Sequence, residues 1–150
     1  MDEDFVTHKF LDLVFNAFRD SKRRTILWLL DKNELTADTL AEKLKISRPA
    51  LEKHTKQMME FGLLDRRAET IPNLHYLYFI PDCTRELVRG LFDSADNFRN
   101  AIESEYNERI ESQEQLFILG NINKSHYSAV KSQYEKILNK FMNEPEEVAE

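Results

Sequence analysis

The stretch "ISRPALEKHTKQMMEFGLLDRR", residues 46–67, has the start, the spacing and the end of one amphipathic helix. Ser47 is a favourable N-cap residue, and Pro49 falls in the first turn, where its missing N–H breaks no helical hydrogen bond. Gly62 is the residue type that commonly follows a helix C-terminus. Four side chains between these limits recur at helical spacing: Leu51, Thr55, Met58 and Met59. The stretch therefore predicts a helix over residues 48–61.

The segment before this helix predicts a second short helix close to it. Thr36 is a suitable N-cap for "TADTLAEKLKI", whose leucines and alanine form one apolar face. Only "KIS" separates the two helices, and two short helices joined by such a tight turn form a helix-turn-helix unit. Upstream, residues 5–18 and the run "SKRRTILWLLDKN", which opens at Ser21, predict two further helices, with Trp28 in the core.

Two short β-prone runs follow the glycine. The runs "LLDRRAE", residues 63–69, and "HYLYFI", residues 75–80, flank "TIPN", residues 70–73, whose Pro and Asn favour a turn. A β-hairpin directly after the second helix of a helix-turn-helix occupies the place of the wing in a winged helix. The predicted fold is therefore mainly α with a small β-hairpin, a winged helix-turn-helix domain followed by long C-terminal helices.

The C-terminal half carries two long helical patterns. Residues 84–118 span about 50 Å as one helix, and its narrow apolar stripe requires a partner helix. Gly120–Asn121 ends this pattern, and the next helix carries side chains at coiled-coil spacing: Tyr127, Val130, Tyr134, Ile137 and Phe141. This organisation predicts a winged-helix domain over residues 1–82, a helical dimerisation extension over residues 83–143 and an acidic flexible tail over residues 144–150.

The charge of the chain is unevenly distributed. The net charge is −6, which by itself argues against binding to nucleic acid. Residues 19–67, however, contain 12 Lys and Arg against 8 Asp and Glu, a net charge of +4. The positive excess therefore coincides with the predicted helix-turn-helix, where contacts with phosphates would be favoured.

Several classes of protein are disfavoured by the sequence. The single cysteine, Cys83, permits no intrachain disulfide and no cysteine-based zinc site within one chain. The N-terminus has no secretory pattern, and the longest apolar runs fall far short of the ~20 residues that cross a bilayer. No glycine-rich phosphate loop or nucleophile elbow occurs. We expect a cytoplasmic, nucleoid-associated protein that is not an enzyme and has no cofactor or metal.

One face of the predicted 48–61 helix carries long polar side chains opposite its apolar stripe. In a major groove, Arg and Lys pair with guanine, Gln pairs with adenine, and Glu accepts from cytosine. Basic residues that open the second helix and the wing suit the phosphate backbone. The predicted DNA-binding residues are Lys22, Arg23, Arg24, Ser47, Arg48, Glu52, Lys53, His54, Lys56, Gln57, Arg66 and Arg67. The alternative for each is an ordinary solvated polar or charged group, which most surface helices carry.

The first helix has two apolar sides, so one side remains for a partner beyond its own core. The stripes of the two C-terminal helices also require partners. The predicted dimer-interface residues are Phe10, Val14, Phe18, Leu91, Phe98, Ile102, Ile110, Tyr127, Tyr134 and Phe141.

The stretch "SRPALEKHTKQMMEFGLLDRR" resembles the recognition helix and first wing strand of ArsR-like winged helix-turn-helix regulators of the archaeal type. The family pattern begins with Ser, one further residue and then Pro or Ser, continues through Ala, an aliphatic residue and Arg/Lys–His, and ends in Glu-x-Gly-Leu. The matching residues are Ser47, Pro49, Ala50, Leu51, Lys53, His54, Lys56, Met58, Glu60, Gly62 and Leu63. With the two preceding helices and the wing, the resemblance covers roughly residues 10–82.

The resemblance implies a homodimeric, DNA-binding transcription regulator that dimerises through its first and last helices. It also implies that Arg48, Glu52, Lys53 and His54 face the bases. This sequence departs from the pattern at Thr55, where an apolar residue is usual, and at Glu52, where Ser is common. The wing tip lacks the usual Gly, and the Cys-x-Cys motif of metal-sensing members is absent, so metal sensing is not implied.

The sequence thus favours a dimeric regulator whose partners are double-stranded DNA and a second copy of the chain. One alternative is a winged-helix protein-interaction scaffold that uses the acidic helical arm. Another is an architectural protein that binds DNA without sequence preference, which the net charge of −6 disfavours.

Overall fold

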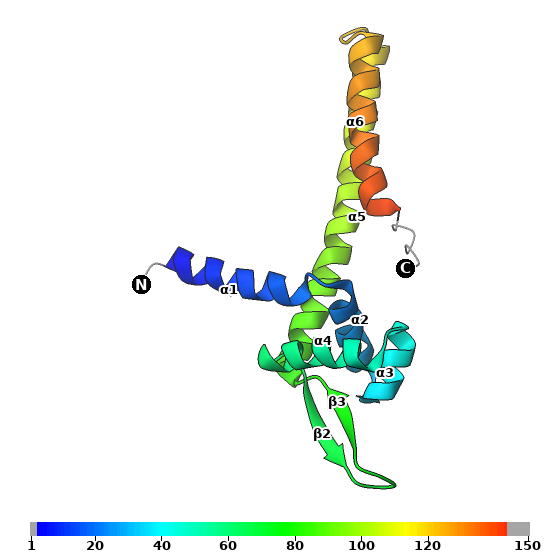
Figure 1. Ribbon diagram of the computed structural model, residues 1–150. Helices are drawn as coiled ribbons and strands as arrows, with labels where there is room; N and C mark the ends of the chain where they lie inside the picture. The colour runs from blue at the N-terminus through cyan, green and yellow to red at the C-terminus, as the bar shows by residue number, and fades with distance from the viewer. Residues whose placement is uncertain (1–2, 144–150) are drawn as a thin grey trace. The chain divides into compact units, whose positions relative to one another are not determined.

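The computed structural model describes the backbone of residues 3–143 and the side chains from residue 8 onward. The predicted acidic tail, residues 144–150, lies outside the described residues. The chain divides into two compact units, Met1–Gly90 and Leu91–Glu150. Figure 1 shows both units and labels their helices.

The N-terminal unit contains the predicted helices in the predicted order. They are α1 (Glu3–Phe18), α2 (Ser21–Lys32), α3 (Ala37–Leu44) and α4 (Arg48–Glu60). α3 begins at the predicted cap, because the Thr36 hydroxyl accepts a hydrogen bond from the Thr39 N–H at 3.2 Å. The turn between α3 and α4 is tight, with Lys45 in the left-handed region at φ 54°. The helix-turn-helix prediction is therefore confirmed.

Both ends of α4 form as the sequence predicts. The Ser47 hydroxyl accepts from the Ala50 N–H at 3.3 Å and caps the N-terminus. At the other end, Gly62 adopts φ +75°, a conformation that side chains disfavour. The Leu63 N–H then donates to the Met58 carbonyl at 3.0 Å, which closes a Schellman motif. The chain therefore leaves α4 in a fixed direction and enters the hairpin.

The sheet contains the predicted hairpin and one further short strand. β2 (Asp65–Glu69) and β3 (His75–Phe79) pair antiparallel, with Arg67 opposite Leu77. β1 (Leu35–Thr36) pairs with the other edge of β3, so the strand order is β1-β3-β2. β1 was not predicted, because two residues are too few to show a strand periodicity.

The core of the N-terminal unit is one apolar cluster between the helices, the sheet and the first turns of α5. Its fully buried members include Ile26, Leu27, Leu30, Leu40, Leu51, Met58 and Val88. Trp28 was predicted to lie in this core, but its side chain is 50% exposed. Leu27 and Leu30 occupy the core face of α2, whereas the Trp28 ring faces outward with Lys32 Nζ 5.3 Å from its centroid. That prediction is wrong.

The two C-terminal helices are continuous through the predicted ranges. α5 (Asp82–Ile118) contributes its first turns to the N-terminal unit and the rest to the C-terminal unit. α6 (Lys124–Met142) begins where the Asn123 side chain accepts from the His126 N–H at 2.8 Å. Gly120, at φ +77°, lies in the turn that joins them.

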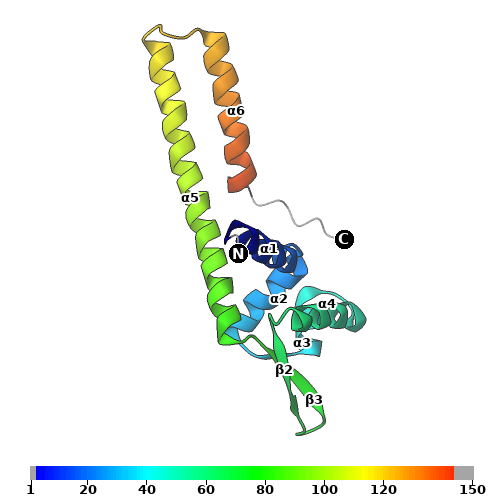
Figure 2. The same ribbon diagram turned by 90° about the vertical axis from the view of Figure 1, so that its left-hand side faces the viewer.

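The C-terminal unit is a helical hairpin held together by aromatic contacts. Three aromatic pairs join the helices, with ring centroids 5.8, 5.3 and 5.2 Å apart: Phe98–Phe141, Tyr106–Tyr134 and Phe117–Tyr127. Residue numbers rise on one helix as they fall on the other, so the helices run antiparallel, as Figure 2 shows. The partner that the apolar stripe of α5 requires is therefore α6 of the same chain. None of the helices within the described residues combines the length and apolar character needed to cross a membrane.

Candidate nucleic-acid interface

The surface of α4 opposite the core carries most of the predicted base-facing residues. Glu52, Lys53 and Lys56 are exposed, whereas His54 and Gln57 are half-buried. On the core side, Thr55 is 1% exposed, and its hydroxyl donates to the Glu52 carbonyl at 3.2 Å. This unusual polar core residue therefore has its hydrogen bond satisfied within the helix.

Arg48, at the first position of α4, is engaged by two carboxylates. Its Nη1 lies 2.5 Å from Asp38 Oδ1, and its Nε lies 3.1 Å from Glu52 Oε1. All three side chains are exposed, so these ion pairs are weak in water and open at little cost. The pairs hold the Arg48 and Glu52 side chains beside each other at the N-terminal end of the helix. Direct contact of either residue with a base remains a prediction.

The basic cluster at the start of α2 is tied to neighbouring backbone carbonyls and to α4. The Asp20 carboxylate accepts from the Lys22 N–H at 2.8 Å and the Arg23 N–H at 3.1 Å, which offsets the unfavourable placement of cations at a helix N-terminus. Lys22 Nζ donates to the Leu44 carbonyl at 3.3 Å. Arg24 Nη1 donates to two carbonyls at the end of α1, each at 2.7 Å. These contacts give the cluster a structural role that the sequence did not indicate.

The Gln57 side chain also forms a hydrogen bond within the N-terminal unit. The half-buried Arg23 donates from Nη2 to Gln57 Oε1 and thereby joins α2 to α4. In this conformation the Gln57 carbonyl oxygen is not free to read adenine. The neighbouring His54 has a buried Nδ1 without a hydrogen-bond partner among the described residues. Only part of its ring is therefore available on the surface.

The wing carries the last two predicted DNA-binding residues. The Arg66 guanidinium lies 4.1 Å from the centroid of the Tyr76 ring. Arg67 Nη2 lies 2.5 Å from Glu34 Oε2 and 3.6 Å from Glu69 Oε1. Arg66 therefore offers the freer positive charge on β2.

The N-terminal residues predicted for the dimer interface lie beside an apolar groove. The Phe10 side chain is 62% exposed, and Val14 and Phe18 are half-buried. A groove of about 400 Å³ runs between these residues, the end of α4 at Phe61 and the start of α5 at Cys83. The structure therefore leaves an apolar surface on α1, as the sequence predicts for a helix with two apolar sides.

The C-terminal residues predicted for the dimer interface pack mainly within their own chain. Phe98, Tyr127, Tyr134 and Phe141 take part in the aromatic pairs, and Ile102 is 7% exposed. Two further predicted residues are half-buried: Leu91 and Ile110. These contacts cover part of the stripe within one chain, whereas Phe98 stays 58% exposed and Phe141 40% exposed. A dimer contact of the same residues stays a prediction.

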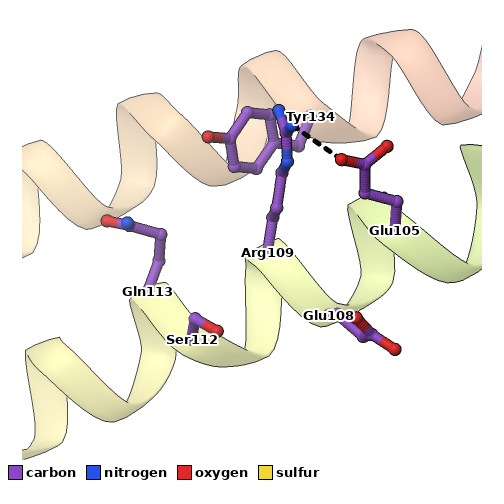
Figure 3. A pocket seen from close by; sticks show the side chains of 6 residues that line it. All are labelled: Glu105, Glu108, Arg109, Ser112, Gln113 and Tyr134. Atoms are coloured by element: carbon purple, nitrogen blue, oxygen red, sulfur yellow. Dashed lines mark hydrogen bonds and ion pairs between the residues drawn. The ribbon is translucent and has the colours of Figure 1, made fainter.

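A polar hollow of about 370 Å³ on the helical hairpin centres on Arg109, as Figure 3 shows. Its Nη2 donates to Glu105 Oε1 at 2.8 Å, and its guanidinium lies 4.9 Å from the Tyr106 ring centroid and 6.0 Å from that of Tyr134. The hydrogen bond and charge of Glu105 raise the pKa of Arg109 above its ordinary value. Arg109 therefore reinforces the contact between α5 and α6.

Residues 20–66 match the family described as "Bacterial regulatory protein, arsR family". The matched segment runs from the cap of α2 to the beginning of β2 and includes the whole helix-turn-helix. This match confirms the resemblance to ArsR-like regulators over residues 20–66, whereas the archaeal type stays a prediction. The family consists of regulatory proteins rather than enzymes, in agreement with the expectation for this chain. No curated protein matches the sequence.

Several solved structures share the fold. Reduced HlyU from Vibrio cholerae N16961 has a TM-score of 0.54 at 23% identity and covers 61% of this chain and 94% of its own. The homodimeric winged helix-turn-helix DNA-binding domain of Mb0332 from Mycobacterium bovis, a possible ArsR-family transcriptional regulator, has a TM-score of 0.56 at 20% identity. It covers 65% of this chain and 89% of its own. MepR from S. aureus, solved as a DNA complex, has a TM-score of 0.51 at 12% identity, covering 73% and 95%.

Proposed function

Because residues 20–66 carry an ArsR-family regulatory domain, we propose that this protein is a sequence-specific, double-stranded DNA-binding transcription regulator that acts as a homodimer. The recognition helix, residues 48–61, enters the major groove, and the wing, residues 63–80, lies on the backbone and in the minor groove. A location on the nucleoid in the cytoplasm follows from this role.

The exposed face of α4 is the observation that carries the proposal. Lys53 and Lys56 project from it, and neither forms an ion pair with a described residue. The helix that presents them is fixed at both ends by its Ser47 cap and its Schellman motif. Donors on a rigid helix suit guanine O6 and N7 in a major groove, because little backbone freedom is lost on binding.

The homodimer is supported by the apolar surface on α1. Exposed aromatic side chains such as Phe10 and Phe15, each 62% exposed, are costly to leave in water and suit a two-fold contact between identical helices. The similar domain of Mb0332 is homodimeric. A two-fold dimer would read a pseudo-palindrome with half-sites about 34–36 Å apart.

Selection of genome fragments with the purified full-length protein at ~150 mM salt tests this proposal. We expect enrichment of one pseudo-palindromic site. Lys53→Ala should then weaken binding to that site by about 1–3 kcal/mol. Lys136 is an exposed lysine of the helical hairpin. Its substitution, Lys136→Ala, is the matched control and should leave binding unchanged. Equal affinities of the wild type and Lys53→Ala would refute the assignment of α4 as the reading helix.

A protein-interaction scaffold is the second candidate function. Exposed apolar side chains at the end of the helical hairpin favour it, with Ile118 65% and Leu119 70% exposed. The two functions differ in their dependence on salt, because each phosphate contact contributes nearly one unit to the slope of log K against log salt. Absence of both duplex retention and fragment enrichment at ~150 mM salt would favour the scaffold.

A further inference from the structure

The turn between β2 and β3 presents apolar side chains where the family pattern has glycine. Ile71 is 84% exposed and Leu74 is 67% exposed, so neither side chain packs on the core. Ile71 is the most exposed large apolar side chain among the described residues. In Figure 1 this turn forms the far end of the hairpin, away from α2, α3 and α4. The far end of the wing is therefore apolar.

The turn is also free of negative charge. Residues 70–74, "TIPNL", contain no ionisable side chain. The nearest carboxylate along the sequence, that of Glu69, lies 3.1 Å from His75 Nε2 and 3.6 Å from Arg67 Nη2. Arg66, above the Tyr76 ring, adds a positive charge to the adjoining strand. The end of the wing is thus compatible with the strongly negative groove of DNA, although the whole chain is acidic.

The shape of the turn is held by a short-range contact. His75 Nδ1 lies 2.7 Å from the Asn73 carbonyl oxygen, while its Nε2 faces Glu69 across the hairpin. Pro72 fixes one backbone dihedral between the two apolar side chains. Ile71 and Leu74 are therefore presented on a braced support rather than on a loose loop.

These properties match one mode of DNA contact. The minor groove is narrow, and proteins that enter it often place Leu, Ile or Pro between base steps, which unstacks the bases and bends the duplex by about 20–90°. Building on the function proposed above, we infer that the wing turn inserts Ile71 and Leu74 as an apolar wedge into the minor groove and bends the operator. The Asn73 side chain, beside the wedge, carries a donor and an acceptor for the floor of that groove.

A wedge differs from a phosphate contact in its dependence on salt. Insertion of apolar groups neutralises no phosphate and releases no counterion. Loss of the wedge should therefore lower the affinity without changing the slope of log K against log salt. Loss of a phosphate-binding lysine should lower both.

The test uses full-length protein and a duplex of about 24 base pairs that carries the enriched site, with a donor and an acceptor dye at its ends, about 80 Å apart when the duplex is straight. Binding of the wild type should raise energy transfer, because a bend brings the duplex ends together. Ile71→Ser with Leu74→Ser should abolish most of this rise and weaken binding roughly tenfold at an unchanged salt slope. Ile71→Val with Leu74→Met keeps the turn apolar and should retain the bend. Leu119 is a 70% exposed apolar residue in another turn. Its substitution, Leu119→Ser, is the matched control and should behave as wild type.

The outcomes separate the wedge from the proposed function. Specific binding of the wild type without a rise in energy transfer would overturn the wedge and leave the regulator intact. The same holds if the double Ser variant bends the duplex as the wild type does, in which case the apolar turn would serve a protein contact. If the wild type retains no specific duplex, the regulator and the wedge both fall.

Discussion

The winged-helix unit and the helical hairpin use different forces to hold their helices. The N-terminal unit surrounds Leu27, Leu40 and Leu51 so completely that each is 0% exposed. In the described part of the C-terminal unit, Ile102 at 7% exposure is the most enclosed side chain, and the aromatic rings meet near the surface. A close-packed core fixes the geometry and loses stability when a side chain is truncated, whereas two helices in one layer can adjust. The unit proposed to read DNA is therefore the rigid one.

Truncation of the core should give the largest difference between the units. Leu27→Ala should lower the free energy of unfolding by about 2–5 kcal/mol, because the enclosed site cannot collapse around the lost methyl groups. Ile102→Ala should cost less, since the two helices can move together. Urea denaturation followed by circular dichroism measures both. Equal costs would mean that the hairpin has a tightly enclosed core, as self-association of two hairpins would provide.

Substitution of one helix N-cap residue in each unit, Ser47 and Asn123, allows the two units to be compared at equivalent positions. Ser47→Ala and Asn123→Ala each remove the acceptor for an N–H in a first helical turn, at a cost of about 0.5–2 kcal/mol. Hydrogen exchange should show reduced protection throughout the N-terminal unit for Ser47→Ala, because α4 packs into the shared core. For Asn123→Ala it should show fraying confined to α6. A general loss of protection from Asn123→Ala would contradict this division.

The aromatic pair Phe98–Phe141 tests what joins the hairpin. A double-mutant cycle with alanine should give a coupling of about 0.5–1.5 kcal/mol from the edge-to-face contact at 5.8 Å. Phe98 with Phe117, two residues far apart on α5, is the control pair and should show no coupling. Zero coupling for the first pair would place the stability of the hairpin elsewhere, with Arg109 and its tyrosines as the next candidates.

Alanine substitutions at two glycines should change the stability of the protein in opposite directions, and these are the smallest effects that we expect. Gly90 lies within α5, and a methyl group there would meet no atom within 4 Å, so Gly90→Ala should stabilise the protein by about 0.5–1 kcal/mol. Gly62 has φ +75°, so Gly62→Ala should destabilise it by about 1 kcal/mol. Thermal melting of both variants measures the signs. A destabilising Gly90→Ala would show that this point of α5 is strained.

The sequence predicted the helix ends well because their causes are local. The acceptors at Thr36 and Ser47 lie within one turn of the N–H groups that they cap, and Gly62 acts through its own backbone. The helix-turn-helix and the wing followed from these boundaries. For the same reason, the polar residue Thr55 fits the core, since its partner is a carbonyl three residues earlier.

Other features depended on residues that are distant in the sequence. Arg23 and Gln57 lie 34 positions apart, and nothing in either segment indicates that they meet. The Trp28 side chain is half exposed because the core forms against the face of α2 that carries Leu27 and Leu30. β1 exists because β3 passes beside Leu35 and Thr36, not because of their own pattern.

The sequence by itself determined where the helices begin and end, where the hairpin turns and where the positive charge gathers. These properties arise from contacts within a few residues or from the order of charges along the chain. Only the tertiary structure decided that α6 covers the stripe of α5, that Arg23 and Gln57 hold each other, and that Ile71 and Leu74 stay outside the core. A periodic stripe requires a partner but does not identify it, because the same spacing suits any apolar helix face.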